Sequence, residues 1–101
     1  MMAPKKKKPL VSSDDFEYIS RRQIGMNIRK IREAKGVSQS ELAREANMKA
    51  PYVSGVEKAR RNVSLVNLLK ICYALRVPLS DIAEGIDFET IPEALKVLGR
   101  E

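Results

Sequence analysis

The sequence predicts an all-α fold of five or six short helices. Apolar residues recur three and four positions apart in several segments, which is the spacing of one helix face. Residues that favour helix caps stand at the ends of these segments, and no segment shows the apolar–polar alternation of a β-strand. With 101 residues, the chain is long enough for one domain with a modest core.

The first helix is predicted over residues 23–36. Its buried face carries Ile24, Ile28 and Ile31 at helical spacing, and Gly36 is suited to end it. Two starts fit the sequence, namely a cap at Ser20 or an earlier helical turn from Ser13. The second start would bring Phe16 and Ile19 into the helix, and both would then need a surface to pack against.

The second and third helices follow closely. Ser38 and Glu41 form an S-x-x-E capping box, in which each side chain accepts from the other residue's backbone N–H, so a helix is predicted over residues 38–46. Asn47 tolerates the left-handed conformation that ends a helix. The third helix covers residues 50–58, with Pro51 in the first turn, where a missing N–H costs little. Their buried residues are Leu42, Ala43 and Ala46 in the second helix, and Val53 and Val56 in the third.

A fourth helix is predicted over residues 65–76, capped by Ser64. One face carries Leu65, Leu68, Cys72 and Leu75, with Ile71 beside it. A short fifth helix follows at 80–85, and residues 91–100 resemble a sixth, with Pro92 in its first turn. The domain organisation is then a flexible basic N-terminal arm at 1–19, a folded domain at 20–86, and a C-terminal helical extension at 87–101 that serves as a dimerisation element or a lid.

Composition excludes several classes of chemistry. The chain contains no histidine and a single cysteine, Cys72, so the Ser-His-Asp and Cys-His catalytic groups, Cys/His zinc sites and an intrachain disulfide all lack their residues. No apolar run is long enough to span a membrane, and no glycine-rich phosphate loop is present. We therefore predict a cytoplasmic protein that is not an enzyme and has no metal, cofactor or membrane partner.

The positive charge is concentrated in the folded domain. Residues 21–83 hold 13 Lys and Arg against 5 Asp and Glu, whereas residues 84–101 hold 2 against 5. Such a basic surface indicates a polyanionic partner, with nucleic acid favoured over an anionic membrane. The four lysines at 5–8 fit three interpretations, namely a solvated tail, a phosphate contact or a nuclear import signal.

Two short helices joined by the three-residue break 47–49 are typical of a helix-turn-helix unit. Over residues 24–82 the sequence resembles the lambda-repressor-like, Cro-type helix-turn-helix family, through the segments GVSQSELA, YVSGVEK and LLKICYALRVPLSDI. The segment YVSGVEKARRN also resembles the controller proteins of restriction–modification operons. The resemblance implies a compact five-helix bundle whose members usually bind DNA as dimers and regulate transcription, with the third helix in the major groove.

The resemblance also implies a set of site residues. Base contacts are expected at Lys49, Ala50, Pro51, Tyr52, Ser54 and Gly55, and phosphate contacts at Ser38 and Gln39. The end of the third helix and the loop after it should face the DNA backbone, so phosphate contacts are also expected there, with a plain solvated turn as the alternative; these residues are Lys58, Arg60, Arg61 and Asn62. Arg32 and Glu57 match a family ion pair, with two separately solvated charges as the alternative.

Two positions depart from the family pattern. Ala50 and Pro51 have no polar side chain, so direct reading shifts to Lys49, Tyr52 and Ser54. For Tyr52 the alternative is packing against the second helix. Ala59 stands where a helix-ending glycine is common, so either the third helix continues or Ala59 is strained.

The fourth helix has more apolar residues than one buried face requires. Val66, Leu69 and Tyr73 form a second stripe, and the C-terminal segment offers a matching face. We predict a symmetric dimer interface, with a lid inside one chain as the alternative. The interface residues are Leu69, Tyr73, Ile91, Leu95 and Leu98.

Together these features predict a sequence-specific, DNA-binding transcription regulator that acts as a homodimeric repressor. The alternative is an antitoxin-type or other protein-partner module that carries a DNA-binding domain.

Overall fold

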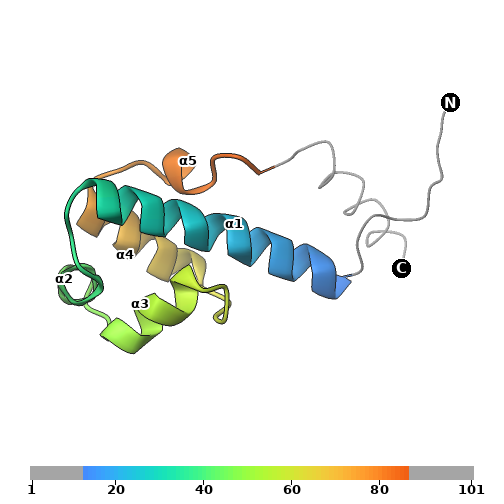
Figure 1. The fold of residues 1–101 in the computed structure, drawn as a ribbon, viewed down its shortest axis with the longest axis horizontal. Helices are drawn as coiled ribbons and strands as arrows, with labels where there is room; N and C mark the ends of the chain where they lie inside the picture. The colour runs from blue at the N-terminus through green and yellow to red at the C-terminus, as the bar shows by residue number, and fades with distance from the viewer. Residues whose placement is uncertain (1–12, 87–101) are drawn as a thin grey trace, which may run out of the picture.

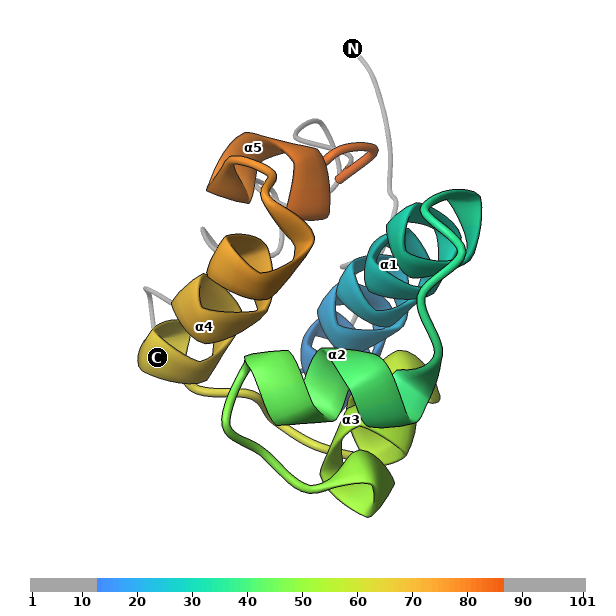
Figure 2. The same cartoon turned by 90° about the vertical axis from the view of Figure 1, so that its left-hand side faces the viewer.

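The computed structural model describes residues 13–86, and these residues form five α-helices and no strand. The helices are α1 (Ser13–Ala34), α2 (Gln39–Glu45), α3 (Ala50–Glu57), α4 (Leu65–Leu75) and α5 (Leu79–Ile82). The all-α prediction is confirmed, and the sixth predicted helix lies outside the described residues. Figure 1 shows α2 and α3 on one side of the long helix α1 and α5 on the other, and Figure 2 shows α5 above α4, with α2 and α3 below.

Helix α1 begins at Ser13, which is the earlier of the two starts. Residues 13–19, which the sequence assigned to a flexible arm, are therefore helical. Phe16 lines a pocket together with Val56, Val63 and Leu68, so the first turns of α1 lie near the loop between α3 and α4. These neighbours are distant in the sequence, and the local pattern around Ser13 does not show them.

Four of the five helices end in the same way. Gly36, Asn47, Ala59 and Arg76 have φ angles of 70°, 57°, 63° and 59°. The N–H of each following residue donates to the carbonyl five residues earlier, at 2.8–3.1 Å for Val37, Met48, Arg60 and Val77. This is the Schellman motif, in which a left-handed residue lets the last carbonyls find donors. Helix α3 thus stops before Ala59, and Ala59 takes the strained conformation.

Two details of the later helices differ from the prediction. Leu65 is 60% exposed rather than buried, because it occupies the first helical position of α4, while Val63 from the preceding loop packs against the core. Helix α5 spans Leu79–Ile82 instead of 80–85, because the extended backbone of Pro78 starts it one residue early.

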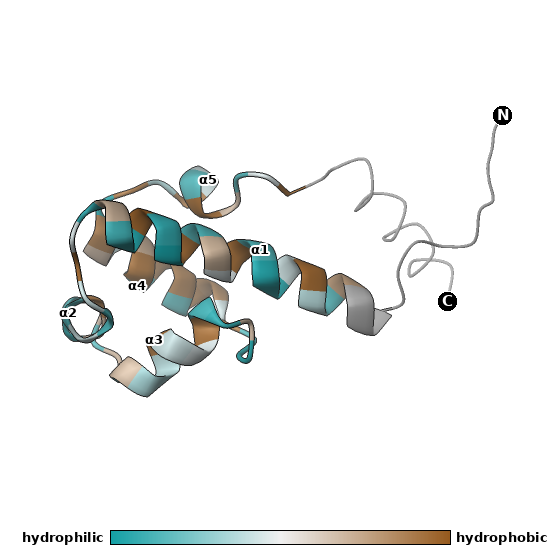
Figure 3. Ribbon diagram, in the orientation of Figure 1, coloured by the Kyte–Doolittle hydropathy of each residue, from teal (hydrophilic) through white to brown (hydrophobic). Residues whose placement is uncertain are grey.

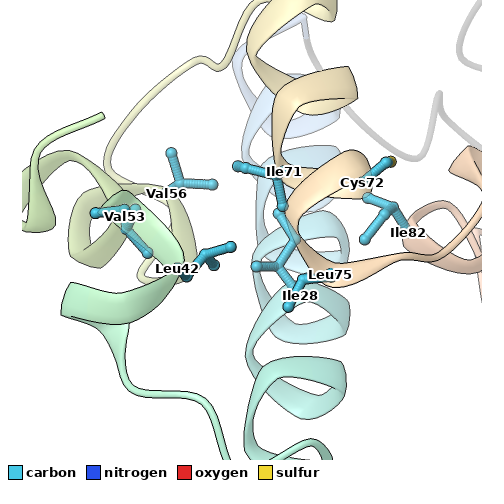
Figure 4. Packing of buried hydrophobic residues seen from close by; sticks show 9 residues of the cluster. Ile28, Leu42, Val53, Val56, Ile71, Cys72, Leu75 and Ile82 are labelled. Carbon is cyan, nitrogen blue, oxygen red and sulfur yellow. The ribbon is translucent and has the colours of Figure 1, made fainter. Parts of the chain in front are cut away.

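The core is built from all five helices. Figure 4 shows Leu42, Val53 and Val56, from α2 and α3, facing Ile28, Ile71 and Leu75, from α1 and α4. Each of these side chains is at most 2% exposed, and burial of one such side chain contributes about 1.5–3 kcal/mol. Figure 3 shows that α4 is mostly hydrophobic, whereas α2 is mostly hydrophilic outside its buried face. The core therefore fixes the buried faces of α2 and α3.

Helices α1 and α3 lie close together at Gly25. A Cβ atom at this position would collide with the carbonyl oxygen of Val56 and would lie 2.8 Å from that of Glu57. Because the obstacles are backbone atoms, only glycine fits here without moving a helix. Gly25 thus sets the distance between α1 and the C-terminal end of α3.

Candidate nucleic-acid interface

The entry into the helix-turn-helix is fixed by the capping box. Ser38 Oγ accepts from the Glu41 N–H at 3.0 Å, and Glu41 Oε1 accepts from the Ser38 N–H at 2.8 Å. The hydrogen bond donated by the Ser38 backbone N–H, with a smaller contribution from the Ser38 side chain, holds the pKa of the Glu41 carboxyl below its usual value. Both orphan donors at the start of α2 are satisfied, so its first turn is defined without any ligand.

The turn between α2 and α3 is short and internally bonded. Asn47 adopts the left-handed conformation, and the Met48 N–H donates to the Ala43 carbonyl at 2.8 Å. Lys49 then takes an extended conformation as the N-cap of α3, and its side chain is exposed. The chain thus reverses within three residues and presents the start of α3 at the surface.

Helix α3 has one buried face and one outward face. Val53 and Val56 are 0% and 2% exposed and pack into the core. The six residues predicted to contact bases all avoid full burial: Lys49 and Pro51 are exposed, and Ala50, Tyr52, Ser54 and Gly55 are half-buried. The six residues thus lie at the N-cap and along the accessible part of one short helix, and two of them, Ala50 and Tyr52, also pack against the core.

Tyr52 is held by neighbours from two other parts of the chain. Its hydroxyl oxygen accepts from Asn67 Nδ2 of α4 at 3.0 Å, and the Arg61 guanidinium carbon lies 5.7 Å from the ring centroid. A Cβ atom at Gly55 would lie 2.8 Å from Arg61 Cγ. The missing side chain of Gly55 therefore accommodates the stem of Arg61, which lies along α3 toward Tyr52.

The loop after α3 carries three exposed basic residues, Lys58, Arg60 and Arg61, and an exposed Asn62. Arg21 of α1 donates through Nε to the carbonyl of Ala59 at 3.2 Å and lies 3.5 Å from Glu17. Helix α1 thus fixes the base of this loop and leaves its cationic side chains at the surface.

Behind this surface lies a buried ionic network. Arg32 donates to both carboxylate oxygens of Glu57, from Nε at 2.6 Å and from Nη2 at 3.0 Å. Arg32 Nη1 also donates to the carbonyl of Val37 at 2.8 Å, and the side-chain amide of Gln39 donates to Glu57 Oε1 at 2.9 Å. Arg32 and Glu57 are 8% and 7% exposed. The hydrogen bonds to Glu57 raise the pKa of the Arg32 guanidinium, so Arg32 keeps its positive charge.

Two of the residues predicted to contact phosphate already make hydrogen bonds within the protein. The Gln39 side chain is bonded to Glu57, and the Ser38 hydroxyl accepts from the Glu41 N–H. The other four, Lys58, Arg60, Arg61 and Asn62, are exposed.

The predicted dimer residues on α4 are accessible. Leu69 and Tyr73 are 47% and 79% exposed, and beside them Val66 is 61% exposed. These three residues line a groove together with the C-terminal end of α2. Ile91, Leu95 and Leu98 lie outside the described residues.

Three positions that support the site had no assigned role at the sequence level. Arg21 is one charge in a charged helix and gives no local signal. Asn67 stands out only as a polar residue in an apolar helix, and Gly25 only as a glycine inside a helical pattern.

Within residues 13–86, no helix is long and apolar enough to cross a membrane. In the same range, no group of three or more His, Cys, Asp or Glu side chains is arranged to hold a metal ion.

Comparisons with known proteins agree with this geometry. Residues 28–82 match the model of a helix-turn-helix family. The chain is 42% identical to Control protein C.BamHI from Bacillus amyloliquefaciens, over 67% of this chain and 82% of that protein. It is 37% identical to Control protein C.MunI from Mycoplasma sp, over 66% of this chain and 92% of that protein. Among solved structures it resembles the restriction-modification controller protein C.AhdI from Aeromonas hydrophila, with a TM-score of 0.63 and 42% identity over 64% of this chain and 98% of that one.

Proposed function

The chain belongs to this helix-turn-helix family and is a DNA-binding transcription regulator, and we propose that it acts as a homodimeric, controller-type repressor. In this proposal α3 enters the major groove, and the loop after it binds the phosphate backbone beside the groove.

The observation that carries the proposal is the way α3 is held. Its buried face is fixed by the core and by the Arg32–Glu57 pair, while the residues at its start remain accessible. A rigid, short helix with an accessible N-terminal half is what base reading in the major groove requires. Lys49, Tyr52 and Ser54 supply the polar side chains, and Ala50 and Pro51 offer apolar contact to a thymine methyl group.

Phosphate binding follows from the charges around α3. Lys58, Arg60 and Arg61 are exposed and adjacent, so a strand that passes the C-terminal end of α3 meets three cations. Phosphate contacts position the protein and make its affinity depend on salt. Gln39 and Ser38 would join this set only by adding a phosphate contact to the hydrogen bonds that they already make.

Dimerisation is supported by the exposed apolar side chains of α4. Leu69 and Tyr73 leave a large apolar area in water, which a second copy would cover through a two-fold axis. Two recognition helices would then meet half-sites about one helical turn apart on the same face of the duplex.

Fluorescence anisotropy tests the DNA part of the proposal. The wild type is titrated with the duplex upstream of its own gene and with a shuffled duplex at several salt concentrations. The variant Arg60→Ala/Arg61→Ala is compared with Lys30→Ala/Arg76→Ala, which removes the same charge next to α5. We expect tighter binding to the upstream duplex, and a slope of log K against log salt that is shallower by about 1.8 for the first variant only.

Equal slopes for the two variants would contradict the phosphate contacts, and equal affinity for the two duplexes would contradict autoregulation through this DNA. A reporter gene behind the same upstream region tests repression. Expression should fall with the wild type and recover with Arg60→Ala/Arg61→Ala, whereas a rise with the wild type would identify an activator.

Light scattering coupled to size exclusion tests the dimer. Leu69→Lys/Tyr73→Lys should shift the protein to a monomer, while Ile19→Lys/Met26→Lys, which changes two exposed apolar residues of α1, should not. A wild-type protein that is monomeric at micromolar concentration would refute the interface and favour a lid within one chain.

A further inference from the structure

The hydrogen bond between Asn67 and Tyr52 has a direction that matters for recognition. A tyrosine hydroxyl can donate its proton or accept through its oxygen, so by itself it can pair with either kind of group. The Asn67 amide nitrogen carries only donors, and it lies 3.0 Å from Tyr52 Oη. The oxygen therefore accepts from Asn67, and its own proton must point elsewhere.

No hydrogen bond within residues 13–86 uses that proton. The ring is also restrained, because Tyr52 packs against the core and the Arg61 guanidinium lies over its face. Asn67 itself is fixed, since it lies in the first turn of α4 and its backbone N–H donates to Ser64 Oγ at 3.1 Å. Tyr52, a half-buried residue near the start of α3, thus has a hydroxyl with a set position and an unused donor.

We propose that Asn67 is a positioning residue that makes Tyr52 a hydrogen-bond donor toward an acceptor atom on DNA. This inference rests on the proposed function, and it adds a residue of α4 to the recognition surface of α3. The expected partners are the acceptors of the major groove, which are guanine N7 and O6, adenine N7 and thymine O4, or a phosphate oxygen. The amino groups of adenine and cytosine are disfavoured, because the acceptor side of the hydroxyl is occupied.

The test begins with selection of sites from a random duplex library by the wild type, Tyr52→Phe, Asn67→Ala and the double variant. Affinity for the wild-type consensus duplex and for a shuffled duplex is then measured by anisotropy. Each single variant should bind the consensus duplex about 2- to 12-fold more weakly, the range of one hydrogen bond. The double variant should lose no more than Tyr52→Phe alone, because Asn67 acts through the hydroxyl.

The same experiment identifies the source of the acceptor. If both single variants relax the preference at the same base-pair position, the hydroxyl donates to a base. If both weaken binding with an unchanged preference, it donates to a phosphate. Either result supports the proposal. An Asn67→Ala protein with wild-type affinity and preference, or losses that multiply in the double variant, would overturn it.

A carboxylate at position 67 provides a sharper control. It can only accept a hydrogen bond, so the Tyr52 hydroxyl would donate to it instead of to DNA. In the Asn67→Asp background, removing the hydroxyl with Tyr52→Phe should change affinity less than twofold, because the added charge is present in both proteins. If removal of the hydroxyl still lowered the affinity for DNA several-fold in this background, the direction of its hydrogen bond would not depend on residue 67, and the proposal would be wrong.

Two further readouts separate the possible failures. A wild type that selects no sequence from the library would refute both the proposed function and this inference, whereas a selected site with uncoupled variants would refute only the role of Asn67. If Asn67 had a merely structural role, its loss would lower the melting temperature and would weaken binding to the shuffled duplex as much as binding to the consensus duplex. We expect instead that binding to the shuffled duplex stays within twofold of the wild type if the acceptor is on a base.

Discussion

The Arg32–Glu57 pair should show a strong non-additivity when its members are removed. Both side chains are less than 10% exposed, and they share two hydrogen bonds at 2.6 and 3.0 Å. Replacing Arg32 by Met leaves the Glu57 carboxylate in the protein interior with the Gln39 amide as its remaining partner. Replacing Glu57 by Met leaves the guanidinium with the Val37 carbonyl and with Glu33, which lies 3.9 Å away.

Breaking a buried pair costs about 3–5 kcal/mol, because one charge remains buried without its partner. We place Arg32→Met at the upper end of this range and Glu57→Met at the lower end, since exposed Glu33 can still neutralise Arg32. The double variant leaves no buried charge and retains apolar volume, so its loss should be about 0–1 kcal/mol. A small domain has a total stability of about 5–15 kcal/mol, so each single variant should come close to unfolding.

Urea unfolding followed by far-ultraviolet circular dichroism measures all four proteins at pH 7. A double variant that is more stable than either single variant would support the ion pair. Losses that add within about 0.5 kcal/mol would mean that the two charges act independently, and the reasoning would then be wrong.

Three other changes test separate contacts. Gly25→Ala should cost several kcal/mol or prevent folding, because its methyl group meets two backbone carbonyls; a melting temperature within a few degrees of the wild type would contradict this close approach. Burial raises the pKa of the Cys72 thiol, so a thiol reagent at pH 8 should label the native protein far more slowly than the urea-unfolded protein. Because this raised pKa favours the neutral thiol, the stability that it contributes should be complete below about pH 8 and should decline as the pH rises further. The folded pKa of Glu41 is lowered by Ser38, so its contribution is present above the unfolded value and is lost as the pH falls below about 4; the wild type and Glu41→Gln should therefore converge in stability in acid.

The parts of the fold that the sequence predicts well depend on neighbours along the chain. The capping box of α2 and the Ser64 cap of α4 involve residues three positions apart, and both are present. The buried valines of α3 follow from helical spacing, because a helix has one face to bury. Local patterns are therefore sufficient for the helix-turn-helix itself.

The parts that the sequence misses depend on distant residues. The first turns of α1 share a pocket with residues that lie at least forty positions further along the chain, and no pattern around Ser13 reveals that surface. The exposure of Leu65 has the same origin, because another residue fills the place that helical spacing assigned to it.

The candidate site divides in the same way. The sequence identifies the residues of α3, since they fall in one motif. It does not show that Gly55 makes room for Arg61, or that the Tyr52 hydroxyl meets Asn67, fifteen residues later. The contact between Tyr52 and Asn67 arises only when α4 lies beside α3, so the direction of this hydrogen bond is a tertiary property.

Ala59 shows why one helix end carries no clear sequence signal. A left-handed conformation costs a residue with a Cβ about 1–2 kcal/mol relative to glycine. Glycine at this position would lose about 0.4–1 kcal/mol through the greater freedom of its unfolded chain. It would lose about 0.8 kcal/mol more because the Ala59 methyl group is only 7% exposed in the folded protein. The gain and the losses nearly cancel, so alanine and glycine are almost equivalent there. Because alanine and glycine give nearly the same stability at position 59, the residue found there does not reveal that α3 ends before it.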